Sequence, residues 1–262
     1  MFLSRLRING ARPGARRLLS SPQRLHAAVM SSFPDLLPAA PAVPDASEGP
    51  RVLWRLDRNA PAELFLFIVS PDRPDMTHIV EQAGWPAAAA DRATLGWQTR
   101  PYGPFLDRLT AGSTWSFRLT ANPVHHIRRK PDEPIKRTAH VTAFHQISWL
   151  LDADRQQRAG FRISEKPDDK RLLPGGTTQS GHPHHGDRFE VTVRDQRHLS
   201  FNKSRSNVSS RSPVSLVTVT FDGQLEVTDP ERLRQTLVRG LGKSKAYGCG
   251  LMTLAPVPTG TR

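Results

Sequence analysis

The most restrictive feature of this chain is the order in which strand-like and helix-like segments follow one another. Residues 1–8 alternate apolar and basic side chains, which is typical of a half-buried strand. A helix is predicted to start at Ser21-Pro22, because serine is a good N-cap and proline suits the first helical position. Further along the chain we expect strands at Val52–Asp57, Glu63–Val69 and Thr94–Thr99, with a short helix capped by Asp75 between the last two.

The second half of the chain repeats this order. Thr114–Ala121 alternates apolar and polar residues as a half-buried strand does, and a helix is predicted at about Val141–Arg158. The remaining expected elements are strands at Phe161–Ser164, Phe189–Arg194, Val214–Phe221 and Leu251–Leu254, and a helix opened by Asp229-Pro230. Two successive β-α-β-β-α-β units predict an α+β protein made of tandem ferredoxin-like (RRM-like) domains, at residues 1–100 and 113–262.

The charge balance narrows the class of partner. The chain has 37 Lys and Arg against 24 Asp and Glu, a formal net charge of +13. Such a surplus favours a polyanion, because basic side chains that meet phosphates release counterions. The plainer interpretation is a soluble protein from an Arg-rich genome. Cys249 is the single cysteine, which fits a reducing cytoplasm, and no apolar run is long enough to span a membrane.

The N-terminus is rich in arginine and has no acid before Asp35, as an organelle transit peptide would. We expect a strand there instead, because the apolar and basic residues alternate. Gly10, Pro13 and Gly14 are expected to break any amphipathic helix that follows.

The segment Gly240–Gly250 is the most distinctive in the chain. Its Gly-Lys-Ser core resembles a nucleotide P-loop, but position 237 is Leu where the first glycine should be, and a helix is expected before it. A glycine-rich turn with Lys243, Ser244 and Lys245 suits an RNA backbone. A tight helix-to-strand connection that needs positive φ angles is the structural alternative, and the two are compatible.

His26 is the candidate catalytic residue. It lies at the margin of the apolar stripe of the first helix, with Arg24 beside it and no acid within eight residues. A basic setting lowers the pKa of an imidazole and keeps a neutral base available near pH 7. Cleavage of RNA by its own 2′-hydroxyl needs such a base, or an acid for the leaving oxygen. A structural or merely exposed histidine is the alternative.

Other histidines are weaker candidates. His182, His184 and His185 could bind a metal, but proline and glycines flank them and no cysteine or carboxylate cluster completes a tetrahedral site. We therefore expect no metal and no small-molecule cofactor.

Two further basic segments are predicted to contact RNA. One follows the strand at 114–121, and the other is the Ser-rich stretch Phe201–Pro213, for which a solvated loop is an equally good interpretation. Together with Arg24, the candidate RNA-binding residues in these segments are Arg128, Arg129, Lys136, Arg137, Lys203 and Arg205.

Several short motifs, spread in order over nearly the whole chain, resemble the CasE family, the endoribonuclease of type I-E CRISPR systems. The matching stretches are Met1–Leu6, Leu25-His26, Phe117–Pro123, Ile147–Leu150, Val219–Leu225 and Gly240–Pro256. The resemblance implies two ferredoxin-like domains that clamp a CRISPR repeat hairpin in pre-crRNA and cut it without metal. It implies 2′-hydroxyl attack, which leaves a 2′,3′-cyclic phosphate and a 5′-hydroxyl, and a product that stays bound within the Cascade complex in the cytoplasm.

His26 matches the catalytic histidine of that family. Members often carry a tyrosine three residues earlier, where this chain has Gln23, which can donate a hydrogen bond to phosphate but cannot transfer a proton. The loop at 165–186 looks longer than usual. The alternatives are a non-catalytic RNA-binding subunit of a CRISPR ribonucleoprotein, a metal-dependent nuclease or phosphatase that uses the His182–His185 cluster, and a basic protein without RNA specificity.

Overall fold

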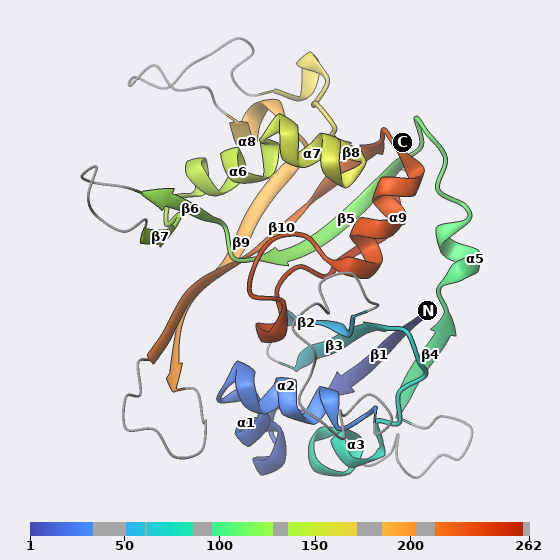
Figure 1. Ribbon diagram of the computed structural model, residues 1–262, viewed down its shortest axis with the longest axis vertical. Helices are drawn as coiled ribbons and strands as arrows, with labels where there is room; N and C mark the ends of the chain where they lie inside the picture. The colour runs from blue at the N-terminus through green and yellow to red at the C-terminus, as the bar shows by residue number, and fades with distance from the viewer. Residues whose placement is uncertain are drawn as a thin grey trace.

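Two antiparallel sheets, each with helices packed on one face, form the body of the protein (Figure 1). The computed structural model describes residues 1–33, 51–60, 62–85, 96–127, 136–171, 185–202 and 213–258. Within those ranges, none of the helices has both the length and the apolar character needed to cross a bilayer.

The first unit contains sheet A, whose strand order is β2-β3-β1-β4. Its elements in chain order are β1 (Phe2–Ile8), α1 (Pro13–Leu19), α2 (Pro22–Met30), β2 (Leu53–Ala60), β3 (Glu63–Ser70), α3 (Thr77–Ala83) and β4 (Trp97–Pro101). Alternate residues of the central strands, such as Leu6 and Leu66, are fully buried against Leu25, Val29 and Ile79 of the helices. The other face of sheet A carries no helix of this unit among the described residues.

The second unit follows a short helix, α5 (Gly103–Leu106), and contains sheet B, in the order β11-β5-β10-β8 with β9 paired to β10. Its elements are β5 (Thr114–Ala121), β6 (Val124–Ile127), β7 (Lys136–Ala139), α6 (Ala143–Leu151), α7 (Ala153–Ala159), β8 (Phe161–Ile163), η2 (Asp168–Lys170), α8 (His185–Arg188), β9 (Val191–Asn202), β10 (Pro213–Val227), α9 (Pro230–Arg239), η3 (Lys245–Tyr247) and β11 (Met252–Pro256). Strands β6 and β7 form a separate hairpin.

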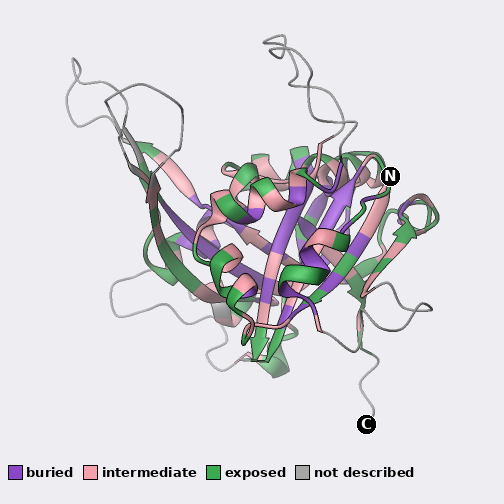
Figure 2. Ribbon diagram, turned by 90° about the horizontal axis from the view of Figure 1, so that it is seen from below, coloured by how far each residue is buried: buried purple, intermediate pink, exposed green. Residues whose placement is uncertain are grey.

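The predicted fold class is confirmed. In sheet A the first and third strands are central and antiparallel, with the second and fourth at the edges. In sheet B the central antiparallel strands are β5 and β10, with β11 on one side and both β8 and β9 on the other, so the ferredoxin-like arrangement gains an extra strand. Figure 2 shows buried residues concentrated along the strands and on the inner sides of the helices.

Several details differ from the sequence prediction, among them the following. Pro13 and Gly14 open helix α1 where we expected them to prevent one, because proline needs no N–H partner at the first helical position and a Cβ on Gly14 would lie 2.2 Å from the Gln82 carbonyl oxygen. The helix expected at 141–158 is two helices, since Asp152 leaves helical geometry (ψ 119°) to cap α7 through the Arg155 N–H. Strand β9 runs to Asn202, well beyond Arg194.

A buried arginine joins the two sheets. Arg55 of β2 is 1% exposed, and its guanidinium makes a two-point ion pair with Asp57 at 2.6 and 3.0 Å. The same group donates to the carbonyl oxygens of Arg118 and Leu251, at 2.7 and 3.0 Å, and to the Thr253 hydroxyl. Arg118 of β5 in turn pairs with both Asp57 and Asp222. The guanidinium therefore satisfies acceptors on β5 and β11 as well as on its own strand.

Replacing this arginine is expected to loosen the junction between the sheets. Arg55→Ala would leave two buried carbonyl oxygens without their donor and Asp57 with one cation fewer. Breaking a buried pair in this way costs about 3–5 kcal/mol. Urea denaturation should show that loss, whereas Arg162→Ala, which breaks an exposed pair with Glu226, should cost under about 1 kcal/mol. Equal losses in the two variants would contradict the assigned role of Arg55.

Candidate functional site

Helix α2 positions the candidate catalytic histidine. The Ser21 hydroxyl accepts from the Gln23 N–H, and Pro22 follows as the first helical residue, so the helix begins where the sequence predicts. Leu25 and Val29 are buried against sheet A, which fixes the rotation of the helix. His26 then lies at the edge of the buried stripe and is half-buried.

The imidazole of His26 is in a partly dehydrated position. Its Nδ1 atom is buried and has no hydrogen-bond partner among the described residues. Burial lowers the pKa of His26 below the ordinary 6.5, because a charged imidazole is poorly solvated there. The neutral form, which can accept a proton, therefore predominates at neutral pH.

The glycine-rich loop follows helix α9, as expected, and runs through η3 into β11. Five of its residues have positive φ angles: Gly240, Gly242, Ser244, Gly248 and Gly250. Its shape is held by hydrogen bonds from Leu241 N–H to the Gly250 carbonyl (2.9 Å) and from Gly250 N–H to the Thr120 carbonyl (2.7 Å), and by the Asn122 amide, which donates to the Ser244 hydroxyl at 2.9 Å. The loop is thus anchored to β5.

The two candidate segments, far apart in the sequence, lie side by side. Helix α2 packs against η3, the middle of the glycine-rich loop. Gly248, directly after η3, lets the loop lie close on β2 as well, because a Cβ there would lie 2.6 Å from the Trp54 ring. The structure therefore brings the segment that carries His26 next to the segment that carries Lys243, Ser244 and Lys245.

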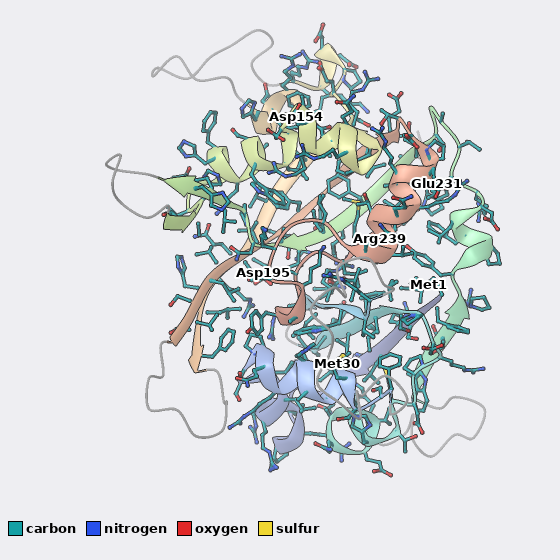
Figure 3. The ribbon with its side chains drawn as sticks, in the orientation of Figure 1. Met1, Met30, Asp154, Asp195, Glu231 and Arg239 are labelled. Atoms are coloured by element: carbon teal, nitrogen blue, oxygen red, sulfur yellow. The ribbon has the colours of Figure 1, made fainter. Side chains whose placement is uncertain are left out.

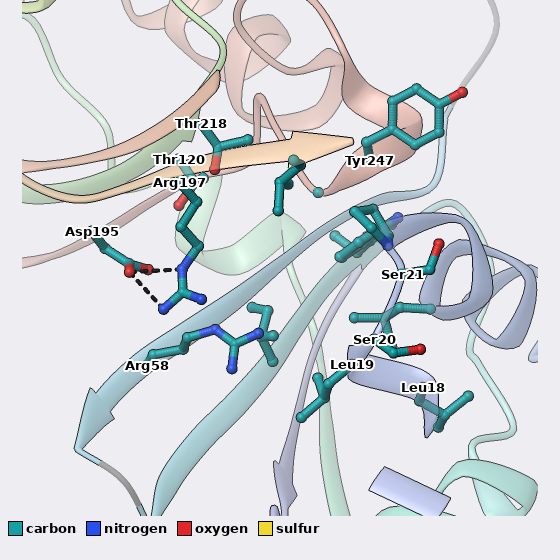
Figure 4. A pocket seen from close by; sticks show the side chains of 16 residues that line it. Leu18, Leu19, Ser20, Ser21, Arg58, Thr120, Asp195, Arg197, Thr218 and Tyr247 are labelled. Carbon is teal, nitrogen blue, oxygen red and sulfur yellow. Dashed lines mark hydrogen bonds and ion pairs between the residues drawn. The ribbon is translucent and has the colours of Figure 1, made fainter. Parts of the chain in front are cut away.

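A cavity of about 140 Å³ lies at this junction (Figure 4). It is lined by the α1–α2 turn, by Leu25 of α2 and by residues of β2, β9, β10 and η3. Asp195, labelled in Figure 3, comes from β9 of the second unit and yet lines the same cavity as Pro22 of the first. The site is therefore built from both units.

Two arginines at this cavity were missed from the sequence. Arg197 donates to Asp195 at 2.8 Å, and Arg58 lies near both (Figure 4). Desolvation, with repulsion from Arg197, lowers the pKa of Arg58 in spite of Asp195. Arg197 lies beyond the predicted end of its strand, because a bulge with Asp195 at φ 52° interrupts the alternation of β9. Arg58 could have been found from the sequence, because it directly follows Asp57, the last residue of the predicted strand.

Positive charge also collects on the loop side of the site. Lys245 is half-buried, and its pKa is lowered by desolvation first and then by Arg51 and Lys243. Lys243 is exposed, and Ser244 lies between the two. A group of cations that repel one another in this way favours a bound anion such as a phosphate.

The remaining predicted site residues that the structure describes do not line this cavity. Gln23 and Arg24 lie in the first turn of α2, and Arg24 donates to the Ser20 hydroxyl at 3.2 Å. Lys136 and Arg137 lie in strand β7, on the separate hairpin. The predicted residues outside the described ranges are Arg128, Arg129, Lys203 and Arg205.

The histidine cluster considered for a metal is described only in part. His185 lies in helix α8 and its ring stacks on Phe144 at 4.9 Å, whereas His182 and His184 lie outside the described residues. Within the part of the chain that the structure describes, no three His, Cys, Asp or Glu side chains are grouped to hold a metal ion.

Comparison with known proteins gives matches over nearly the whole chain. The family model described as CRISPR associated protein matches residues 1–256. The chain is 28% identical over 261 residues to the CRISPR-associated endoribonuclease Cse3 of Thermus thermophilus, covering 98% of this chain and 100% of the relative. It is also 26% identical over 216 residues to the CRISPR system Cascade subunit CasE of Escherichia coli K12, covering 78% of this chain and 89% of the relative.

Solved structures agree with the sequence matches. A CRISPR endoribonuclease Cse3 bound to 19 nt RNA superposes with a TM-score of 0.67 at 26% identity, covering 98% of this chain and 100% of that one. Thermus thermophilus Cse3 bound to an RNA that represents a pre-cleavage complex gives 0.65 at 27% identity, with 97% and 98% covered.

The lowered pKa of His26 has a measurable effect on stability. The folded protein takes up the His26 proton less readily than the unfolded chain, whose histidine titrates near ~6.5. Above pH ~6.5 the protonation of His26 therefore has no effect on the free energy of unfolding. As the pH falls through that value, it destabilises the fold. We expect the ring resonances of His26 to titrate below ~6.5 in NMR.

The matching stability measurement is urea denaturation of the wild type and of His26→Gln. The difference in unfolding free energy, wild type minus variant, should become less favourable as the pH is lowered from ~7.5 to ~5. A difference that does not change with pH would contradict the desolvated position of the ring.

Proposed function

Because the chain belongs to the CRISPR associated protein family, we propose that it is a metal-independent endoribonuclease that cuts the CRISPR repeat hairpin in pre-crRNA. The observation that carries this proposal is the packing of α2, with its neutral half-buried His26, against the cationic glycine-rich loop. The helix that carries a group able to accept a proton thus packs on a loop whose residues could hold a phosphate. The names of two relatives, an endoribonuclease and a Cascade subunit, support the same function.

In the proposed reaction, the 2′-oxygen of the nucleotide before the cut attacks the adjacent phosphorus. The new P–O2′ bond closes a 2′,3′-cyclic phosphate as the P–O5′ bond breaks. The 2′-hydroxyl proton is lost to a base, and the leaving 5′-oxygen gains a proton and becomes a hydroxyl. His26, neutral near pH 7, suits the role of the base, and a positioned proton-transfer group contributes about 10²–10⁴-fold.

The surrounding cations would supply the rest of the acceleration by position and charge. Lys243, Ser244 and Lys245 would contact the RNA backbone from the loop, and Arg24 would contact it from α2. Arg58 and Arg197 line the cavity between the two units. An RNA strand that crosses from one unit to the other would pass there. Holding the sugar and phosphate in line removes much of the entropic barrier.

We further propose that the unit at 1–100 supplies the catalytic histidine and that the unit at 113–262 supplies most of the RNA grip. In addition to the loop, that grip would use the basic residues Arg128, Arg129, Lys136, Arg137, Lys203 and Arg205. The cleaved RNA would stay bound, and the protein would join the Cascade complex as its relative CasE does.

Substituting the histidine tests the reaction. On a labelled repeat hairpin in excess EDTA, the wild type should make one cut, and a 2′-deoxy nucleotide at that position should abolish it. His26→Ala should bind the hairpin but cleave it at least ~10²-fold more slowly, because the proton-transfer group is gone. Cleavage rates and the chemistry of the product ends are the measurements.

His145→Ala is a suitable control, since His145 is an exposed imidazole of α6 in the second unit, and its cleavage rate should match the wild type. Hairpin binding without cleavage by the wild type would favour a non-catalytic RNA-binding subunit. Activity that disappears in EDTA would favour a metal-dependent nuclease.

Gln23 is proposed to donate a hydrogen bond to the phosphate and to transfer no proton. Gln23→Ala should therefore lower the cleavage rate by about tenfold, the worth of one hydrogen bond to a charged group, and leave the pH dependence of the rate unchanged. His26→Ala should flatten the low-pH limb of that profile. A shifted profile in Gln23→Ala would mean that Gln23 acts by tuning the histidine.

A further inference from the structure

Sheet A has a second face that the cleavage chemistry does not use. The helices cover the face with Leu6, Ile8 and Leu66, so the alternate residues point the other way. The row nearest the second unit, Leu53–Val69–Leu3, packs into the core that the two units share. The next two rows of this face contain aromatic and basic side chains. The row of Phe67 still touches the second unit, because Arg55 beside it is held in the junction, and Phe67 lines a cavity of about 550 Å³ between the two units.

Those two rows are set by the strand register. Phe67 of β3 stands opposite Arg5 of β1, and Arg5 stands opposite Gln98 of β4, while Phe65 stands opposite Arg7. Phe65 and Phe67 are therefore two residues apart on a central strand, on one face, with their ring centroids 6.5 Å apart. Both rings are half-buried, and both β1 arginines are exposed.

Cations already lie against these rings. The Arg5 guanidinium is 5.5 Å from the centroid of Phe65 while it donates to the Gln98 side chain, and Arg55 is 5.3 Å from the centroid of Phe67. Arg5 is exposed, and its contact with Phe65 is exchangeable, since a nucleobase can stack on the same ring and free the guanidinium for phosphate. Arg55 is buried in the junction and stays on Phe67.

The equivalent face of sheet B differs. Its outward residues are polar, among them Ser116, Arg118, Asp222 and Gln224, and Arg118 and Asp222 neutralise each other. The two sheets share a fold, yet of their described open faces only that of sheet A carries a pair of aromatic rings. The aromatic pair is therefore a property of sheet A and not a consequence of the fold.

A cavity continues the basic surface at the edge of sheet A. It has a volume of about 370 Å³ and is lined by Leu3, by Arg100 of β4, by the parallel rings of Tyr102 and Phe105 and by Arg108. The Tyr102 hydroxyl is buried and has no hydrogen-bond partner among the described residues. Arg100 and Arg108 are exposed, against Asp107 nearby.

We propose that the open face of sheet A binds a single-stranded stretch of RNA. Bases would stack on Phe65 and Phe67, and Arg5, Arg7 and Arg100 would contact the backbone. Stacking on rings of a four-stranded sheet and cations along its strands suit single-stranded RNA without strict sequence preference. The acidic side chains of this face on the described strands are Asp57, already paired with two arginines, and the exposed Glu63. Arg5, Arg7 and Arg100 outnumber them, so the net charge favours a polyanion.

This surface is separate from the proposed catalytic site, because helix α2, which carries His26, packs on the opposite face of sheet A. The proposal therefore goes beyond hairpin cleavage and can fail independently of it. The partner it fits is the unpaired RNA that flanks a hairpin, or any other unstructured strand, and the chemistry of recognition is the same for both.

The test is binding of a fluorescent oligouridine of about twelve nucleotides, which forms no hairpin, measured by anisotropy on the full chain. The double variant Phe65→Leu/Phe67→Leu keeps apolar volume but removes both rings, and should bind at least about tenfold more weakly. Its hairpin cleavage should stay within about twofold of the wild type, since proton transfer at His26 is untouched. Phe144→Leu, which removes a half-buried ring from helix α6 of the second unit, should bind as the wild type does.

Three further measurements keep the proposal falsifiable. Phe65→Tyr/Phe67→Tyr should retain wild-type affinity, which shows whether any loss in the leucine variant comes from the rings or from a disturbed fold. Arg5→Gln/Arg7→Gln should reduce the salt dependence of binding by about 0.7 per charge removed. Unlabelled hairpin should not displace the oligouridine.

Unchanged affinity in the leucine variant, or lost affinity in a folded tyrosine variant, would overturn the proposal. So would full competition by the hairpin, which would place both RNAs in one site. Binding of an acidic peptide in preference to oligouridine would overturn it in favour of a protein partner.

Discussion

The buried guanidinium of Arg55 is the interaction on which the rest of this structure depends. A charge with 1% exposure has lost its water, and the protein replaces that water with two carboxylate oxygens, two backbone carbonyls and a hydroxyl. Such an arrangement is weakly favourable in energy but demanding in geometry, because any displacement leaves a buried charge unpaired. Since the two carbonyls belong to β5 and to the residue before β11, the second sheet can take few other positions relative to the first.

That fixed position has a direct consequence for the proposed chemistry. Leu251, whose carbonyl accepts from Arg55, follows Gly250 at the end of the glycine-rich loop, and Gly248 of the same loop packs on Trp54, the neighbour of Arg55. The network and the loop are therefore parts of one continuous contact. A loop that carries cations is useful to a phosphate only if it is held still, and here the junction between the sheets holds it beside α2.

Local signals predicted much of this molecule, and long-range contacts account for what they missed. Ser21-Pro22 marks the start of α2 and alternation marks β5, because caps and periodicity are properties of short segments. The same local rules treated Pro13-Gly14 as a helix breaker, since they could not show that Gln82 approaches Gly14 too closely for a side chain. Arg55 is the clearest case: an arginine in a strand is ordinarily exposed, and only the second sheet buries it. The packing of η3 on α2, which are far apart in the sequence, has no local signature at all.

The division of labour between the two faces of sheet A follows from the same geometry. A four-stranded sheet with helices on one side must leave its other side to solvent, to a second domain or to a ligand. Here the first row of that side is used by the shared core, and Arg55 of the second row by the junction. The proposed unpaired-RNA surface uses what these rows leave accessible, the rings of Phe65 and Phe67 with Arg5 and Arg7, on the far side of the sheet from α2. An RNA held at both places would be retained far longer than by either alone, since the second contact forms within a complex that already exists. For an enzyme proposed to keep its product, a second weak contact outside the reacting site raises retention without binding the scissile phosphate more tightly, which would slow the reaction itself.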